Sequence, residues 1–361
     1  MKKSFLRFHL LLLFIVFTSF VSAQTLEQKL AEIDAYAQKV QSDWNVPGFA
    51  MAIVKDDKVV FAKGYGVRKL SSPEKVDENT LFAIASNSKA FTTASLAILV
   101  DEGKLKWDDK VTQYLPDFQM YDAYVTREMT IRDLVSHHSG LDTFSGDLLW
   151  YDTTYSADEL LKRVRYLKPT SSFRSQFGYQ NLMFIAAGKV LEKVSGKTWA
   201  QFVRERFLTP LRMDRTTTSV KDIKDNFASP HNESGGKLRP LPLGNVDNSW
   251  GACGLNASVA ELGNWMRLQL GRGTFEGKQI FSKERSAEMW AQNTILEVNP
   301  FPAKNAPTQM FSGYGLGWFI TDYRGHKMLY HSGGLDGMIS ETGLIPDENL
   351  GVVVLTNSET G

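Results

Sequence analysis

A serine and a lysine three residues apart, Ser86 and Lys89, stand directly before an apolar run at 91–100 that is typical of a buried helix. A helix that begins here places Ser86 at its N-terminus and Lys89 one turn further along the same face. The unpaired N–H groups of a helix start favour an attacking oxygen and a developing oxyanion. An ammonium packed beside a serine in a partly dry cleft loses its proton more readily and can act as the base. The pair therefore predicts a serine nucleophile, Ser86, activated by Lys89.

The serine-to-lysine spacing alone is not specific, because it recurs at Ser72–Lys75 and Ser234–Lys237. The first copy contains Pro73 in a polar stretch, and the second lies among glycines with no helical pattern after it. The structural alternative for Ser86 is a simple N-cap residue. Further motifs along the chain favour the chemical interpretation.

A tyrosine followed two residues later by an asparagine occurs once, at Tyr179 and Asn181. The pair lies in a polar stretch just before a second buried helical pattern at 185–194. A tyrosine near a lysine can exchange protons with the serine and the leaving group. Asn181 can donate a hydrogen bond to a substrate amide. The alternative is a loop tyrosine packed on a helix end.

The triplet His331, Ser332 and Gly333 ends a predicted strand near the C-terminus and is followed by Gly334. A glycine on an edge strand lets a substrate backbone approach and pair with it. The N–H of Gly334 can form an oxyanion hole together with the N–H of Ser86. The triplet therefore predicts a substrate-binding strand.

The same triplet occurs at His138-Ser139-Gly140, where it follows a helix-like run and predicts a structural turn. A metal site at His137 and His138 is not expected, because adjacent residues on a helix diverge and no carboxylate stands at ligand spacing. Cys253, the single cysteine, lies among small residues and is expected to be a buried, inert thiol.

The two ends of the chain carry β patterns and the middle is mostly helical. We expect an α/β (α+β) fold in which one antiparallel sheet, built from about 24–105 and 305–361, is covered by helices. A mostly helical insertion, about 106–304, completes it, with the active site in the cleft between the two parts. Helices are expected at 26–44, 91–100 and 185–194 and after a capping box at 258–261, and strands at 49–54, 59–65, 314–321, 328–331, 339–345 and 351–356.

Charge and the N-terminal segment limit the function and the location. The 41 basic and 40 acidic residues nearly cancel and no basic run is present, so nucleic-acid binding has no electrostatic support. Residues 1–23 have the positive start, apolar centre and small-residue end of a secretory signal peptide. The apolar run is too short to span a bilayer. We therefore expect an exported protein, periplasmic or secreted, with no stable membrane anchor.

Together, the three motifs and their order resemble the serine β-lactamase and penicillin-binding protein superfamily, in particular its class C branch. The resemblance extends over nearly all of the chain after residue 23, with connecting segments at 82–89, 105–109, 114–116, 130–141, 251–265 and 314–318. It implies a β-lactamase/transpeptidase-like fold and no metal or organic cofactor. By resemblance, the site consists of the nucleophile Ser86, its partner Lys89, the acid/base Tyr179, the substrate contacts Asn181, His331, Ser332 and Gly333, and the oxyanion donors Ser86 and Gly334.

Two departures from the class C pattern affect the expected activity. Class C β-lactamases carry lysine and threonine where this chain has His331 and Ser332, so a fixed charge beside Tyr179 and a partner for a β-lactam carboxylate are missing. A histidine there is similar to the D,D-peptidases, D-aminopeptidases and esterases of the superfamily. Family members also continue into a helix that covers the sheet, whereas this chain stops at Gly361, so we expect a fragment with an apolar patch.

The leading interpretation is a serine peptidase or esterase acting on a D-amino-acyl peptide or a small ester. The alternatives are a class C-like β-lactamase and a non-catalytic penicillin-binding sensor, although a sensor needs neither Lys89 nor Tyr179. An α/β-hydrolase is excluded, because no Gly-x-Ser-x-Gly motif occurs. The substrate is not specified, since the pocket walls at 120–155 and 219–248 carry no readable pattern. An aromatic cluster of Phe144, Trp150, Tyr151 and Tyr155 suggests an apolar cleft, or ordinary core packing.

Overall fold

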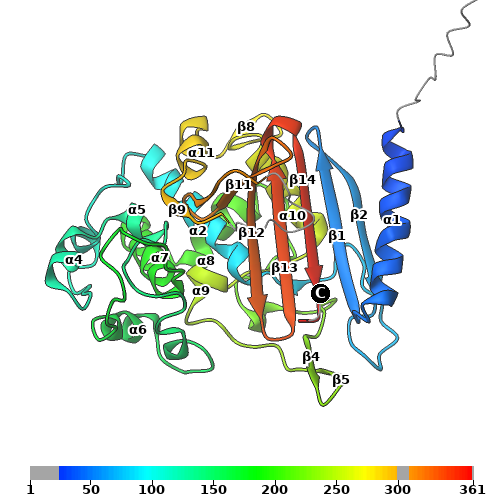
Figure 1. The fold of residues 1–361 in the computed structure, drawn as a ribbon, viewed down its shortest axis with the longest axis horizontal. Coiled ribbons are helices and arrows are strands. Elements are labelled where there is room, and N and C mark those ends of the chain that lie inside the picture. The colour runs from blue at the N-terminus through cyan, green and yellow to red at the C-terminus, as the bar shows by residue number, and fades with distance from the viewer. Residues whose placement is uncertain (1–23, 299–308, 360–361) are drawn as a thin grey trace, which may run out of the picture.

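The computed structural model describes residues 24–298 and 309–359, and the signal peptide expected at 1–23 lies outside them. Its largest element is an eight-stranded antiparallel sheet in the order β2-β1-β14-β13-β12-β11-β10-β9, seen face-on in Figure 1. The strands are β1 (Gly48–Lys55), β2 (Lys58–Gly66), β9 (Thr294–Leu296), β10 (Ser312–Tyr314), β11 (Phe319–Tyr323), β12 (His326–Leu335), β13 (Met338–Ile345) and β14 (Leu350–Thr356).

The two ends of the chain meet in this sheet. β1 pairs with β14, with Phe49 opposite Thr356, and with β2 across a tight turn at Asp56 and Asp57, both of which have positive φ. Alternation along β14 directs Val353 and Leu355 into the core. The predicted sheet from both chain ends is confirmed.

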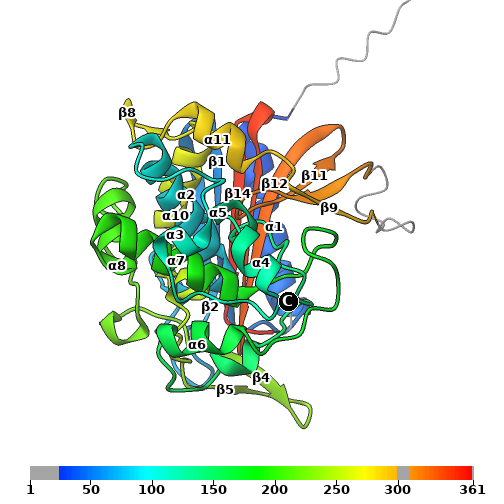
Figure 2. The ribbon, with the colours of Figure 1, turned by 90° about the vertical axis from the view of Figure 1, so that its left-hand side faces the viewer.

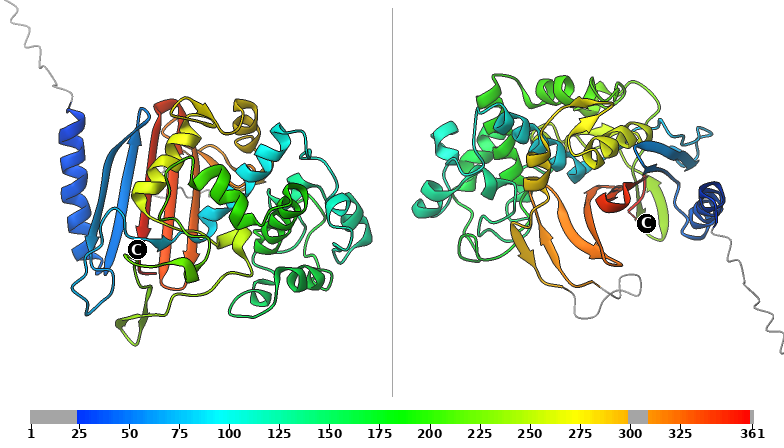
Figure 3. Two further views of the ribbon diagram at one scale, coloured as in Figure 1. Left: turned by 180° about the vertical axis from the view of Figure 1, so that it is seen from behind. Right: turned by 90° about the horizontal axis from the view of Figure 1, so that it is seen from above.

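The helices gather mostly on one face of the sheet (Figure 3). They are α1 (Leu26–Asp43), α2 (Ser88–Asp101), α3 (Val111–Tyr114), α4 (Ala123–Glu128), α5 (Ile131–Leu134), α6 (Ala157–Val164), α7 (Asn181–Ser195), α8 (Trp199–Val203), α9 (Trp250–Cys253), α10 (Val259–Leu270) and α11 (Lys283–Met289). Short helical turns lie at η1 (Ala85–Asn87), η2 (Asp147–Leu149), η3 (Arg204–Leu208), η4 (Val220–Asp222) and η5 (Pro346–Glu348). Small two-stranded sheets pair β3 (Phe82–Ala83) with β6 (Asn256–Ala257), β4 (His231–Ser234) with β5 (Lys237–Pro240), and β7 (Thr274–Phe275) with β8 (Lys278–Gln279).

Helix α2 forms the centre of the molecule. It is buried along almost its whole length and packs against α7 and α9, while α10 packs on β14 and β1. Gly103, with φ +67°, follows the C-cap residue of α2, and Gly196, with φ +71°, is the C-cap residue of α7. Figure 2 looks at the molecule from the side opposite α1 in Figure 1 and shows α2, α5 and α7 together. Helix α1 lies beside β2.

Three local predictions differ from the structure. The single strand expected at 314–321 is two antiparallel strands, β10 and β11, since the segment between them turns at Gly317, whose φ is +77°. β12 does not end near His331 but continues to Leu335. Ser258 caps α10, but Glu261 does not close the capping box, because its carboxylate accepts hydrogen bonds from the Arg215 N–H and the Thr216 hydroxyl.

The sheet face turned to the viewer in Figure 1 has no helix in front of β12 to β14 among the described residues. Val352 and Val354 on that side of β14 are only half-buried. No helix in the described part of the chain is both long and apolar enough to cross a membrane.

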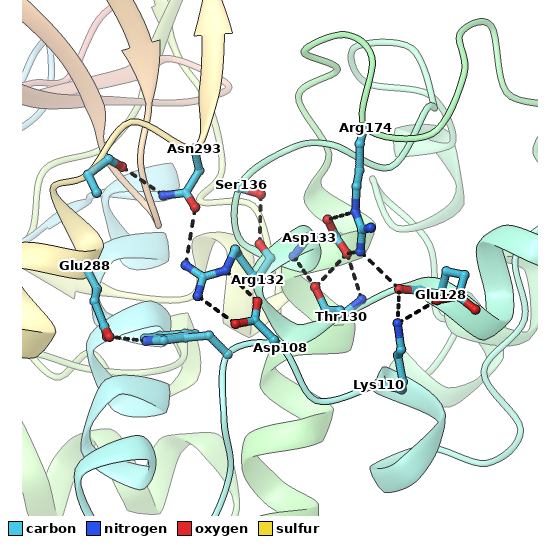
Figure 4. Close-up of polar contacts among 12 residues, drawn as sticks. Asp108, Lys110, Glu128, Thr130, Arg132, Asp133, Ser136, Arg174, Glu288 and Asn293 are labelled. Carbon is cyan, nitrogen blue, oxygen red and sulfur yellow. Dashed lines mark hydrogen bonds and ion pairs between the residues drawn. The ribbon is translucent and has the colours of Figure 1, made fainter.

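A polar network ties the loop that leads to Tyr179 to α5 (Figure 4). The Arg174 guanidinium donates to both oxygens of the buried Asp133 carboxylate, at 2.8 and 2.7 Å. Asp133 also closes the capping box with Thr130 that begins α5. A bidentate pair of this kind fixes both distance and orientation. The network therefore holds the loop rigidly where it enters the site.

Candidate active site

Ser86 lies in the short turn η1 that leads directly into α2. The preceding residue, Ala85, is buried and has a φ of +46°, a conformation that L-residues with a side chain rarely adopt. Surrounding packing must hold such a residue, and strain of this kind is concentrated at functional sites. The turn presents the Ser86 hydroxyl to Lys89, whose Nζ lies 2.8 Å from the Ser86 Oγ.

Lys89 is completely buried, and its Nζ has two further neighbours besides Ser86. These are the Asn181 Oδ1 at 2.6 Å and the Ala252 carbonyl oxygen at 3.1 Å. Burial lowers the pKa of Lys89 to about 7, because the ammonium loses its hydration. A neutral amine has two N–H groups and one lone pair, and both oxygens can only accept. The two N–H groups therefore go to Asn181 and Ala252, and the lone pair faces the Ser86 hydroxyl.

We expect the pH dependence of kcat/KM to follow Lys89. The lysine acts as a base only when it is neutral, so activity should rise with pH and reach half its plateau near pH 7, the pKa of Lys89. Initial rates on a p-nitrophenyl ester between pH 5 and 9 measure this limb. We call this rise of kcat/KM with pH the acidic limb. An acidic limb with its midpoint below pH 5 would assign the base to a carboxylate instead.

Tyr179 is buried beside the same two residues. Its ring lies 4.8 Å from the Lys89 Nζ, and it packs 4.2 Å from the His137 ring. Burial raises the pKa of Tyr179 above the ordinary phenol value, although a hydrogen bond with Ser86 opposes the shift. Tyr179 is therefore a neutral phenol that can donate a proton, which agrees with the missing fixed charge at position 331.

Asn181 begins α7, and both ends of its amide have partners inside the protein. Its Oδ1 accepts from Lys89, and its Nδ2 donates to the Asp147 Oδ2 at 2.7 Å. Asn181 also lines the cavity described below, where its second Nδ2 hydrogen can reach a substrate. The structure thus gives it a contact with the base that sequence reasoning did not foresee.

His331, which was expected to contact the substrate, is buried and neutral. Burial lowers its pKa to about 3. Its Nδ1 lies 2.6 Å from the Ser332 carbonyl oxygen, so that nitrogen carries the proton. The bare Nε2 accepts from the Tyr314 hydroxyl at 3.0 Å. The His331 side chain is not among the described residues that line the cavity.

Beyond Tyr330, β12 has β13 on one side and no partner strand from β11 on the other. In an antiparallel hairpin, hydrogen-bonded and non-hydrogen-bonded residue pairs alternate. Leu335 and Met338 form the hydrogen-bonded pair that closes the β12–β13 hairpin, so the next pair, Gly334 and Ile339, is not hydrogen-bonded. The Gly334 N–H therefore points away from β13, to the open edge of β12. A Cβ at Gly333 would lie 2.2 Å from the Ile84 carbonyl oxygen and 3.0 Å from the Ser86 nitrogen. Glycine at 333 is therefore required by the close approach of β12 to the Ser86 turn. Sequence reasoning had instead attributed this glycine to substrate approach.

A cavity of about 550 Å³ opens at Ser86. Three residues of the aromatic cluster predicted from the sequence, Phe144, Trp150 and Tyr151, line this cavity. The fourth, Tyr155, does not line it and stacks on Arg163 instead. The lining of the cavity also includes Ser332 and Gly334 and two carboxylates, Asp147 and Asp336. The described lining residues are Ser86, Phe144, Asp147, Leu148, Trp150, Tyr151, Phe177, Tyr179, Asn181, Cys253, Phe319, Ser332, Gly334, Leu335 and Asp336.

Sequence reasoning missed Asp147, Asp336 and His137 as parts of this site. His137 was considered only as a metal ligand, which was not expected, and the structure puts its ring against Tyr179, with Nδ1 accepting the Gln180 N–H at 3.0 Å. Asp147 lies in a segment without periodic pattern. Cys253 is buried as predicted, and burial raises the pKa of its thiol, but it also borders the cavity. In the described part of the chain, no three metal-ligating side chains cluster.

Comparison with known families agrees with this geometry. A family model described as Beta-lactamase matches residues 33–361. The chain belongs to the β-lactamase family. The fold of the family's solved members, with an antiparallel sheet flanked by helices, is the one observed here.

Individual β-lactamase-family relatives differ in activity. The unguisins hydrolase ungD' of Aspergillus campestris is 31% identical over 355 residues, covering 94% of this chain and 62% of the relative. The octameric penicillin-binding protein homologue from Pyrococcus abyssi has a TM-score of 0.79 and 25% identity, covering 92% of this chain and 74% of that one. A D-stereospecific amidohydrolase from Streptomyces has a TM-score of 0.72 and 21% identity, covering 90% and 93%, and so shows the fold alone. The chain spans about three fifths of the length of the curated relatives it matches.

Proposed function

We propose that the protein is an exported hydrolase that cleaves an amide or ester bond through an acyl-enzyme on Ser86. The observation that carries the proposal is the position of Lys89, buried at 2.8 Å from the Ser86 hydroxyl with its pKa lowered to about 7. The lone pair of the neutral amine is aimed at the proton that must leave. The N-terminal segment 1–23 supports export to the periplasm or medium.

In the acylation step, Lys89 takes the Ser86 proton as the Oγ–C bond to the substrate carbonyl forms. The N–H groups of Ser86 and Gly334 receive the developing oxyanion. Tyr179 donates its phenol proton to the leaving nitrogen or oxygen as the C–N or C–O bond breaks, and the proton held by Lys89 restores Tyr179. In deacylation Lys89 takes the Tyr179 proton, and Tyr179 takes a proton from the water that attacks the acyl carbon. The Oγ–C bond then breaks as Lys89 gives its proton to Ser86.

The charges of the cavity favour neutral or cationic substrates. The described residues that line it include two carboxylates, Asp147 and Asp336, and no lysine or arginine. A β-lactam or a peptide with a free C-terminal carboxylate brings a negative charge to this cavity, and His331 is neutral. D-amino-acyl amides with a free amine, and neutral esters, fit better than β-lactams. A D-aminopeptidase-like or esterase activity therefore fits this cavity better than a β-lactamase or a penicillin sensor does.

We expect kcat/KM for p-nitrophenyl butyrate to exceed that for the anionic p-nitrophenyl hemisuccinate by about fivefold or more, beyond their difference in spontaneous hydrolysis. Asp336→Asn should narrow the ratio. D-alanine p-nitroanilide, which carries an amine, and benzylpenicillin, which carries a carboxylate, extend the comparison to amides. Equal rates on both esters, or rapid penicillin hydrolysis, would contradict the proposed substrate class and favour the β-lactamase alternative.

A further inference from the structure

We propose that Asp147 is a positioning residue that fixes the orientation of the Asn181 amide and thereby aims the lone pair of Lys89 at Ser86. The inference rests on the proposed acyl-enzyme chemistry and adds a residue to it. Asp147 touches neither Ser86 nor Lys89 by hydrogen bond. It acts through Asn181.

Asp147 accepts hydrogen bonds through both of its carboxylate oxygens and donates none. The Asp147 Oδ1 accepts from the Trp150 indole N–H at 2.9 Å, and its Oδ2 accepts from the Asn181 Nδ2 at 2.7 Å. Both oxygens therefore accept, as a carboxylate does. The nitrogen end of the Asn181 amide must face Asp147, so its oxygen end must face Lys89.

This orientation decides where the lone pair of Lys89 points. With the Asn181 Oδ1 and the Ala252 oxygen both accepting, the two N–H groups of the neutral amine are used, and the lone pair is left for Ser86. A flipped amide would offer Lys89 an N–H instead. The lone pair would then accept that hydrogen bond and would no longer be available to the serine proton.

Packing holds Asp147 in place. Gly146 precedes it with a φ of +84°, and a Cβ there would lie 2.6 Å from a Leu167 methyl carbon and 2.7 Å from one of Leu182. The other titratable groups around Lys89 are Cys253, Tyr179, His137 and His331, and burial favours the neutral form of each. The Asp147 charge raises the pKa of Lys89 against the effect of burial.

Asp147→Asn should reverse the amide of Asn181. The introduced side-chain amide keeps its oxygen toward the Trp150 N–H and turns its nitrogen toward Asn181. Asn181 then presents its oxygen to the introduced amide and its nitrogen to Lys89. Ser86 activation should fall about 10- to 100-fold, the cost of misplacing a catalytic group. The acidic limb should also move to lower pH, because a negative charge near Lys89 is lost.

The double variant Asp147→Asn, Asn181→Asp provides the rescue. The amide at position 147 then accepts from Trp150 and donates to the carboxylate at position 181. The second oxygen of that carboxylate accepts from Lys89, so the lone pair again faces Ser86. The plateau rate should recover by about tenfold over Asp147→Asn. Its acidic limb should lie above that of the wild type, because a carboxylate now contacts the amine.

Asp142→Asn is the matched control. It removes the same charge five residues earlier, in a side chain bonded only to the Thr143 N–H among the described contacts. Its rate and its acidic limb should both stay at the wild-type values.

The experiment measures phosphonylation by an alkyl fluorophosphonate from pH 5 to 9, followed by intact mass, so that no substrate has to be known. The Ser86 Oγ–P bond forms, the P–F bond breaks with loss of fluoride, and the proton passes to Lys89. Three results together support the inference. Asp147→Asn is phosphonylated more slowly than the wild type, and the acidic limb of its pH dependence lies at lower pH. The double variant recovers the rate, and Asp142→Asn reacts like the wild type. The inference is overturned, while the proposed function stands, if Asp147→Asn has the phosphonylation rate and the acidic limb of the wild type. It is also overturned if the double variant reacts no faster than Asp147→Asn. A wild-type enzyme that is not labelled at Ser86 overturns the proposed function and this inference with it.

Discussion

Replacing Lys89 by methionine is expected to lower kcat/KM for p-nitrophenyl butyrate by about 10²- to 10⁴-fold, the usual contribution of a general base. Methionine fills a similar volume but has no lone pair able to take the Ser86 proton. Arginine at this position should fail as well, since a guanidinium stays protonated. The measurement is the initial rate at pH 8, above the pKa of about 7 that burial gives Lys89.

Lys104→Met is the control for this result, because Lys104 is a half-exposed lysine just beyond the end of α2 that pairs with Glu102. It should leave the rate unchanged within experimental error. If folded Lys89→Met kept kcat/KM to within a few-fold of the wild type, Lys89 would have only a structural role and another group would be the base.

Replacing Tyr179 by phenylalanine is expected to lower kcat/KM by about 10²- to 10³-fold, with a larger loss on amides than on activated esters. An amide nitrogen cannot leave without a proton, whereas p-nitrophenolate leaves readily as an anion. The structure predicts this difference because burial raises the Tyr179 pKa, so the phenol is a proton donor. Rates on D-alanine p-nitroanilide and p-nitrophenyl butyrate measure it.

Tyr155→Phe is the matched control, since Tyr155 stacks on Arg163 and does not line the cavity. An equal loss on the amide and the ester in Tyr179→Phe would assign the hydroxyl to holding Ser86 rather than to protonating the leaving group.

Much of this architecture could be predicted from local sequence patterns. The alternating strands at both ends of the chain and the apolar runs within α2 and α7 are local patterns, which a single sequence displays. The Ser86–Lys89 pair was identifiable because its spacing coincided with the start of a buried helix. Lys89 and Ser86 do contact each other in the structure.

Other features depend on contacts between distant segments, which periodicity does not encode. The Glu261 carboxylate serves Arg215 and Thr216, 46 and 45 residues away, instead of its own helix start. Asp147 reaches Asn181 across 34 residues, from a segment with no regular pattern. His331 was expected to contact the substrate because its motif position suggested it, whereas tertiary packing buries its ring against Tyr314. Side-chain direction on a strand depends on register, which the neighbouring strands set.

The most direct test of the acyl-enzyme is the intact mass of the protein after mixing with p-nitrophenyl butyrate and quenching in acid, for the wild type beside Ser86→Ala. We predict one butyryl group on the wild type, located by peptide mapping on Ser86, and none on Ser86→Ala. A butyryl group that persists in Ser86→Ala, or that maps to Cys253 at the cavity wall, would contradict Ser86 as the nucleophile.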